Sequence, residues 1–152
     1  MAGPHDDAAQ AEFLPRGHVL LVEDDERSAI YMTSALNHLG CEVTRATDGA
    51  DAASAATGTR FDLILMDYKM PLVDGAHATV LIRNHETAQG LPHVPVIAVT
   101  ASMRTEELLQ AGMDGVLLKP VSLETLRGAL LQWLPTHPKG DAPPQAFKSG
   151  DP

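Results

Sequence analysis

The chain has 152 residues, enough for one domain with its own hydrophobic core, and its 20 acidic against 11 basic side chains argue against nucleic acid as a partner. Cys41 is the single cysteine, which excludes an internal disulfide and a multi-cysteine metal site. Because the sequence has no apolar run as long as a signal peptide core or a membrane span, we expect a soluble cytoplasmic protein with no membrane partner.

The first part of the chain indicates two units, each a strand followed by a helix. Residues 1–17 mix Gly, Pro and Asp without periodicity, which predicts a flexible N-terminal segment. We then expect a strand, a helix, a shorter strand and an alanine-rich helix at 18–22, 26–39, 41–46 and 49–58. Gly40 is a typical stop for the first of these helices.

Three further units of the same kind follow. Strands are predicted at 63–66, 95–99 and 116–118, and helices at 76–88, 103–111 and 123–134. Ser122 is a typical N-cap for the last helix. After Pro135 the composition shifts to Pro, Gly, Lys and Ser, which predicts a disordered tail over 135–152. The folded domain is therefore expected over 18–134.

The predicted order of elements favours an α/β fold with a parallel sheet. Each helix has the length of a right-handed crossover between parallel strands. The strands at 18–22, 63–66 and 95–99 are almost wholly apolar, as expected when helices cover both faces of the sheet, whereas the polar residues in 41–46 suit an edge strand. We predict a flavodoxin-like (βα)5 fold with a five-stranded sheet in the order 2-1-3-4-5 and helices on both faces.

Polar residues follow four of the predicted strands at the point where each strand ends. Glu23, Asp24 and Asp25 follow the first strand, and Asp67 follows the third. Thr100 and Lys119 follow the fourth and fifth strands. Because parallel strands share one carboxyl edge, these side chains are expected to converge on one small site. Asp25 is also a typical helix N-cap, and each of the other residues alone has an ordinary structural explanation.

The convergence of Glu23, Asp24 and Asp67 has a chemical consequence. At an effective dielectric constant near 20, two carboxylates 4 Å apart repel by roughly 4 kcal/mol. Either one carboxyl group keeps its proton or a divalent cation binds. Oxygen ligands favour Mg²⁺, with Mn²⁺ as a substitute. Asp67 could then attack phosphorus while Lys119 neutralises the phosphoryl oxygens and Thr100 donates a hydrogen bond.

The motifs around these residues resemble, in order and spacing, those of the receiver domain of two-component response regulators. The resemblance covers about residues 18–134 and is carried by the segments Leu21-Val22-Glu23-Asp24-Asp25, Met66-Asp67-Tyr68-Lys69-Met70-Pro71-Leu72-Val73-Asp74-Gly75, Val99-Thr100-Ala101 and Leu118-Lys119-Pro120. Four separated motifs make the match specific.

The resemblance implies a role for each matching residue. Asp67 would be the phosphoacceptor, Asp24 a direct Mg²⁺ ligand, and Glu23 its companion acid. The backbone carbonyl of Lys69 would be a further metal ligand, and Thr100 and Lys119 would bind the phosphoryl group. The phosphodonor would be a histidine kinase or a histidine phosphotransfer protein, approaching beside the helix that carries Tyr31 and Met32. A downstream protein target is also implied, and the sequence leaves a homodimer open.

The chain departs from the receiver pattern in two places. Val116 stands three residues before Lys119, where receivers often have an aromatic residue whose movement is coupled to that of the threonine. The segment from Thr100 to Gly112 is about one helical turn shorter than the expected pattern. Both departures bear on how phosphorylation would reach a partner.

Two other functions compete with a phosphorylated receiver. One is an interaction module that keeps the fold and works without phosphorylation, which the two departures favour and the complete acidic, Thr and Lys set opposes. The other is a phosphatase of the haloacid dehalogenase type, but Glu23-Asp24-Asp25 lacks the usual D-x-D spacing after the first strand. We expect self-phosphorylation and slow self-dephosphorylation rather than turnover of an external substrate. A stand-alone regulator and a portion of a hybrid histidine kinase both stay open.

Overall fold

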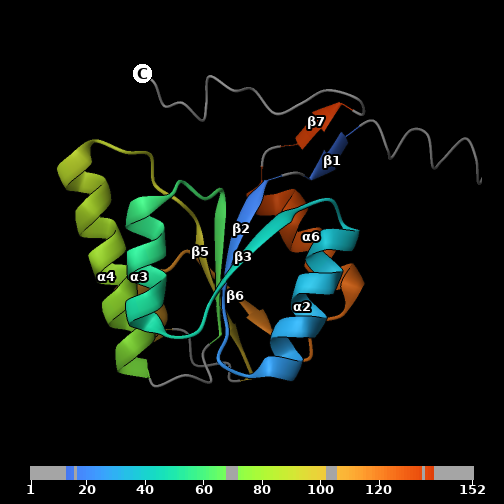
Figure 1. The fold of residues 1–152 in the computed structure, drawn as a ribbon, viewed down its shortest axis with the longest axis horizontal. Coiled ribbons are helices and arrows are strands. Elements are labelled where there is room, and N and C mark those ends of the chain that lie inside the picture. Colours follow the sequence, from blue (N-terminus) through green and yellow to red (C-terminus); the bar gives the residue numbers. More distant parts are fainter. Residues whose placement is uncertain (1–12, 16, 68–71, 102–105, 135, 139–152) are drawn as a thin grey trace, which may run out of the picture.

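A computed structural model describes residues 13–15, 17–67, 72–101, 106–134 and 136–138. Its centre is a five-stranded parallel sheet in the order β3-β2-β4-β5-β6 (Figure 1). The strands are β2 (His18–Val22), β3 (Glu42–Ala46), β4 (Leu63–Asp67), β5 (Val96–Thr100) and β6 (Gly115–Leu118). Numbered along the chain, this is the predicted order 2-1-3-4-5, so the flavodoxin-like fold is confirmed.

Helices cover both faces of the sheet. They are α2 (Glu26–His38), α3 (Gly49–Gly58), α4 (Leu72–Gln89), α5 (Glu106–Gln110) and α6 (Leu123–Trp133). In Figure 1, α2 and α6 lie on one side of the sheet, and α3 and α4 lie on the other. None of the helices within the described ranges is both long and apolar enough to cross a bilayer.

The alternation of side chains along each strand explains the two layers. In β2, Val19 and Leu21 pack with the helices α2 and α6, whereas Leu20 and Val22 pack with α3 and α4. Successive residues of a strand point to opposite faces, so a continuous apolar run provides both cores at once. Leu108 of α5 belongs to the second core and is fully buried.

Caps define the helix ends as the sequence indicates. Asp25, Asp48 and Ser122 each accept a hydrogen bond from a backbone N–H in the first turn of the following helix. Gly112, with φ +103°, ends α5: its N–H donates to Leu109 O, and Met113 N–H donates to Leu108 O. These two bonds form a Schellman motif, which favours glycine at this position. Between Thr100 and Gly112, the described residues thus contain one short helix, α5.

A second, two-stranded sheet joins the ends of the domain, which we did not predict. Strands β1 (Phe13–Pro15) and β7 (Thr136–Pro138) pair antiparallel (Figure 1). They fall within the segments predicted to be flexible (1–17) and disordered (135–152), so the prediction differs from the structure at these six residues. The physical reason is that the pairing joins segments more than a hundred residues apart, which local composition does not reveal.

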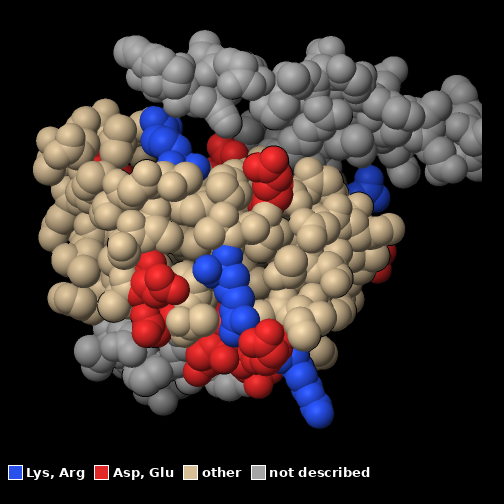
Figure 2. Space-filling view, in the orientation of Figure 1, with Lys and Arg blue, Asp and Glu red and all other residues tan. Residues whose placement is uncertain are grey.

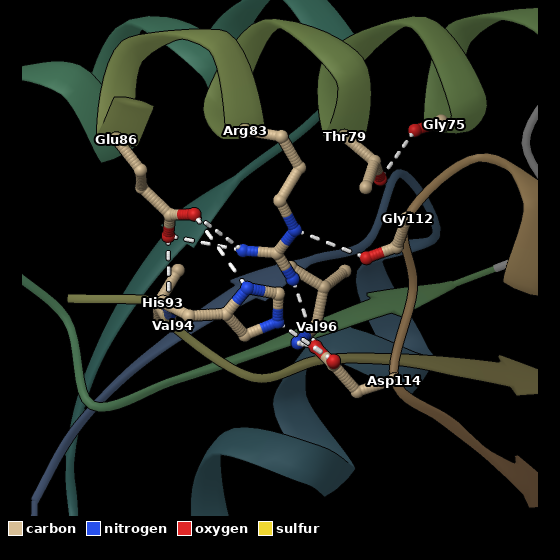
Figure 3. Close-up of polar contacts among 9 residues, drawn as sticks. All are labelled: Gly75, Thr79, Arg83, Glu86, His93, Val94, Val96, Gly112 and Asp114. Atoms are coloured by element: carbon tan, nitrogen blue, oxygen red, sulfur yellow. Dashed lines mark hydrogen bonds and ion pairs between the residues drawn. The ribbon is translucent and has the colours of Figure 1, made fainter. Parts of the chain in front are cut away.

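A polar cluster around Arg83 holds the amino ends of β5 and β6 against α4 (Figure 3). The Arg83 guanidinium donates to both carboxylate oxygens of Glu86, to Asp114 Oδ2 and to the backbone oxygen of Gly112, at 2.8–3.0 Å. The two carboxylates in turn accept from backbone N–H groups at and just before the start of β5: Val94 donates to Glu86, and Val96 donates to Asp114. One arginine thus links the end of α5, α4 and two strands.

We predict that Arg83→Met lowers the free energy of unfolding by about 2–4 kcal/mol, because it leaves the buried carboxylate of Glu86 without its cation. Urea denaturation at pH 7 measures the change. Arg60→Met, at an exposed position, is the matched control and should change the free energy by less than about 0.5 kcal/mol. Equal effects of the two substitutions would show that the cluster contributes no stability.

Candidate functional site

Three carboxylates meet where β2 and β4 end. The two strands are paired up to Val22 and Met66, so the next residues, Glu23 and Asp67, emerge side by side. Both are buried, with 3% and 2% of their surface exposed, whereas Asp24 is exposed. One oxygen atom from each of the three carboxylates lies within 4.8 Å of the others. The sequence prediction that these acids converge is met by the geometry.

Burial affects the protonation of this cluster. It raises the pKa of Glu23 from 4.5 to about 7, and a hydrogen bond with Asp67 adds to the rise. The N–H of Asp25 donates to Glu23 Oε2 at 3.1 Å, which lowers the pKa in part. A retained proton, one of the two outcomes expected for clustered acids, is therefore favoured up to about pH 7 in the metal-free protein.

Lys119, directly after β6, reaches the cluster. Its Nζ donates to Asp67 Oδ1 at 2.6 Å, so the two residues form an ion pair in which the carboxylate is almost wholly buried. Lys119 N–H also donates to the backbone oxygen of Thr100 at 2.8 Å. Thr100 is buried at the end of β5, next to β4 in the sheet. The predicted site residues from four strands therefore lie at one edge.

Two sequence expectations concern neighbouring positions. The backbone carbonyl of Lys69, predicted as a metal ligand, lies outside the described residues and stays a prediction. Val116 lies on β6 opposite Ala98 of β5, and it packs half-buried against the core on the side of α3 and α4. An aliphatic side chain thus occupies the position where the receiver pattern often has an aromatic ring.

The donor set suits a hard divalent cation. Three carboxylate oxygens in close reach, one of them on an exposed residue, match the oxygen ligands and the open positions for water that Mg²⁺ requires. The protein holds like charges together here, and a divalent cation would relieve their repulsion and displace the proton of Glu23. Next to it, the Asp67 carboxylate and the Lys119 ammonium form an ion pair, a combination of nucleophile and cation that is chemically suited to phosphoryl transfer.

The sequence did not identify two polar contacts near the site. Arg45, on the edge strand β3, donates from Nε to the backbone oxygen of Glu23 at 3.0 Å. Tyr31, in the middle of α2, donates from its hydroxyl to the backbone oxygen of Val121 at 2.8 Å, which links this helix to the segment after Lys119. Both contacts depend on strand register and helix packing, and no spacing in the sequence indicates them.

The raised pKa of Glu23 predicts a pH dependence of stability in the metal-free protein. Its folded-state pKa of about 7 exceeds the ordinary 4.5, so the folded protein binds the extra proton. The stability from this group is complete below pH 4.5 and is lost as the pH rises to about 7. We expect this rise in pH to lower the free energy of unfolding by an amount on the order of 2 kcal/mol, and we expect Glu23→Gln to abolish that loss.

Urea denaturation in EDTA at pH 5 and pH 8 measures this effect. The free energy of unfolding of Glu23→Gln, relative to wild type, should be higher at pH 8 than at pH 5. Glu26→Gln, which changes an exposed carboxylate three residues away, is the control and should show little difference between the two pH values. A Glu23→Gln difference that is the same at both pH values would contradict the raised pKa.

Comparison with known proteins agrees with this geometry. The family model for the response regulator receiver domain matches residues 19–131. Transcription factor SKN7 of Candida albicans is 40% identical over 139 residues, which cover 88% of this chain and 24% of that protein. Sensor protein GacS of Pseudomonas syringae pv. syringae is 36% identical over 128 residues, which cover 82% of this chain and 14% of that protein. This chain thus spans less than a quarter of either relative.

Solved structures show the same fold. The receiver domain of sensor histidine kinase PA1611 from Pseudomonas aeruginosa PAO1, with a magnesium ion coordinated in its active site cleft, matches with a TM-score of 0.68 and 38% identity, over 77% of this chain and 96% of that one. The Saccharomyces cerevisiae Ssk1 receiver domain, solved with the histidine phosphotransfer protein Ypd1, matches with a TM-score of 0.72 and 28% identity, over 79% and 90%. The chain therefore belongs to the response regulator receiver domain family.

Proposed function

We propose that Asp67 accepts a phosphoryl group from a phosphohistidine, with Mg²⁺ held by Glu23, Asp24 and Asp67, and that this protein thereby works as the phosphoacceptor of a phosphorelay. The observation that carries the proposal is the 2.6 Å contact between Lys119 Nζ and Asp67 Oδ1 beside the three-carboxylate cluster. The membership of the chain in the receiver family supports it.

The residues divide the chemistry among them. A carboxylate oxygen of Asp67 attacks phosphorus, the P–N bond to the donor imidazole breaks, and its electron pair returns to the ring nitrogen. Lys119 stays beside the acceptor and neutralises charge on the phosphoryl oxygens, and the Thr100 hydroxyl donates to one of them. A bound Mg²⁺ would supply further neutralisation of the same oxygens. The Lys69 carbonyl is proposed as an additional metal ligand.

A hollow beside the site suits the approach of the donor. It is lined by residues of α2, of the end of β5 and of the segment after β6, among them Arg27, Tyr31, Met32, Lys119 and Val121. Tyr31 has 48% of its surface exposed, and Met32 is buried in the core, so the tyrosine is the contact that we propose for a donor helix. The co-crystal of a related receiver with Ypd1 supports a histidine phosphotransfer protein, or the kinase itself, as the donor.

The consequence of phosphorylation is a change of charge at one edge of the sheet. The added phosphoryl group brings negative charge and new acceptor oxygens next to Thr100, the last residue of β5. We propose that this change alters the surface that a downstream protein or a second copy of the chain binds. The protein transfers the group onto itself and hydrolyses it slowly, without turnover of another substrate.

The direct test is labelling with a small phosphodonor. With Mg²⁺ and acetyl phosphate, wild type should gain one base-labile phosphoryl group by intact mass, and Asp67→Asn should gain none, because the acceptor carboxylate is gone. Asp62→Asn, just before the other end of β4, is the control and should be labelled like wild type.

The same experiment separates the competing functions. Absence of label on wild type with acetyl phosphate and with a phosphorylated histidine phosphotransfer protein would contradict the proposal and favour an interaction module that works without phosphorylation. Rapid repeated hydrolysis of phosphate esters, dependent on Asp67, would instead favour a phosphatase.

A further inference from the structure

Arg45 lies where the pairing of β2 with β3 ends. The last backbone hydrogen bond between the two strands joins Glu23 N–H to Ala46 O at 2.9 Å. Beyond it, the chain turns toward the N-cap of α3 at Asp48, so β3 no longer runs beside Glu23. The backbone oxygen of Glu23 instead accepts a hydrogen bond from Arg45 Nε at 3.0 Å. A side chain thus takes the place of a strand partner.

The same guanidinium holds the start of α2. Arg45 Nη1 donates to Glu26 Oε1 at 2.9 Å. One planar group therefore fixes both ends of the segment from Glu23 to Glu26, which contains Asp24. In Figure 2, acidic side chains gather at the lower edge of the molecule, the edge where β2 leads into α2 in Figure 1.

The contact to Glu23 acts on a rigid unit. The oxygen of Glu23 and the nitrogen of Asp24 belong to one peptide plane, so a hydrogen bond that orients this oxygen also orients the start of Asp24. Glu23 and Asp24 are two of the three acids in the cluster. We propose that Arg45 is a positioning residue for the metal site, because it aligns the peptide that joins two of the ligands. This inference rests on the proposed function, in which these acids hold Mg²⁺.

If Arg45 acted only through its charge, its removal would change the affinity for Mg²⁺ in the opposite direction to that expected for a positioning residue. A positive charge near three carboxylates opposes the binding of a cation, so its removal alone should tighten the binding of Mg²⁺. The loss of a group that orients metal ligands should weaken it, by about tenfold or more. Truncation of Arg45 therefore distinguishes positioning from charge by the direction of the change.

The test is isothermal titration of the metal-free protein with Mg²⁺ at pH 8 and fixed ionic strength. We expect Arg45→Met to raise the Kd for Mg²⁺ about tenfold. Arg45→Lys, which keeps the charge and one donor, should recover part of the loss. Glu26→Gln keeps the Nε contact and should change the Kd less than about threefold. Cooperative urea unfolding shows that each variant is folded, and Arg45→Ala replaces the Met variant if that one is not.

Labelling with acetyl phosphate gives a second readout. For Arg45→Met, the Mg²⁺ concentration for half-maximal labelling should rise about tenfold, while the rate at saturating Mg²⁺ stays near wild type. The decisive case is one in which wild type binds Mg²⁺ and Asp24→Asn does not. Unchanged or tighter binding by folded Arg45→Met would then overturn the inference about Arg45 and leave the proposed function intact. Absence of Mg²⁺ binding by wild type would overturn the proposed metal site as well.

Discussion

The site depends on the sheet, which holds carboxylates together against their mutual repulsion. The register between β2 and β4 brings two buried acids, Glu23 and Asp67, to adjacent positions, and the exposed Asp24 lies within reach of both. Alone, such carboxylates separate or keep protons. Here the backbone ladder holds them in place, the pKa of Glu23 rises, and Lys119 pairs with Asp67. The proposed uptake of a cation and then of a phosphoryl group depends on this enforced proximity.

The two edges of the sheet differ in how their carboxylates are held. At the amino edge, Arg83 contacts two carboxylates that also accept from the N–H groups of Val94 and Val96, so these carboxylates are held by several hydrogen bonds. At the carboxyl edge, Lys119 pairs with Asp67, and Arg45 contacts the backbone oxygen of Glu23 and the carboxylate of Glu26. The proposed metal and phosphoryl chemistry lies at this second edge, where the three clustered carboxylates include the exposed Asp24.

The sequence predicted those features that depend on local pattern. Apolar runs such as 18–22 and 63–66 indicated buried parallel strands, and the polar residues that end them indicated the shared site. The β1–β7 pairing was missed because it joins two three-residue segments that are far apart in the sequence and too short to show a strand period. Arg45 was read only as a polar residue of an edge strand. Its contact with Glu23 appears when the register of β2 and β3 is known, and local pattern does not contain that register.

The account requires that a divalent cation bind at the carboxyl edge, beside Asp67. The most direct measurement is the ¹H–¹⁵N NMR spectrum of the protein titrated with Mn²⁺, whose unpaired electrons broaden the signals of nearby amides. The account predicts early loss of the amide signals of Asp24, Asp67 and Lys119, while those of Val94 and Asp114 at the opposite edge persist. Uniform broadening, or loss that begins at the amino edge, would contradict it.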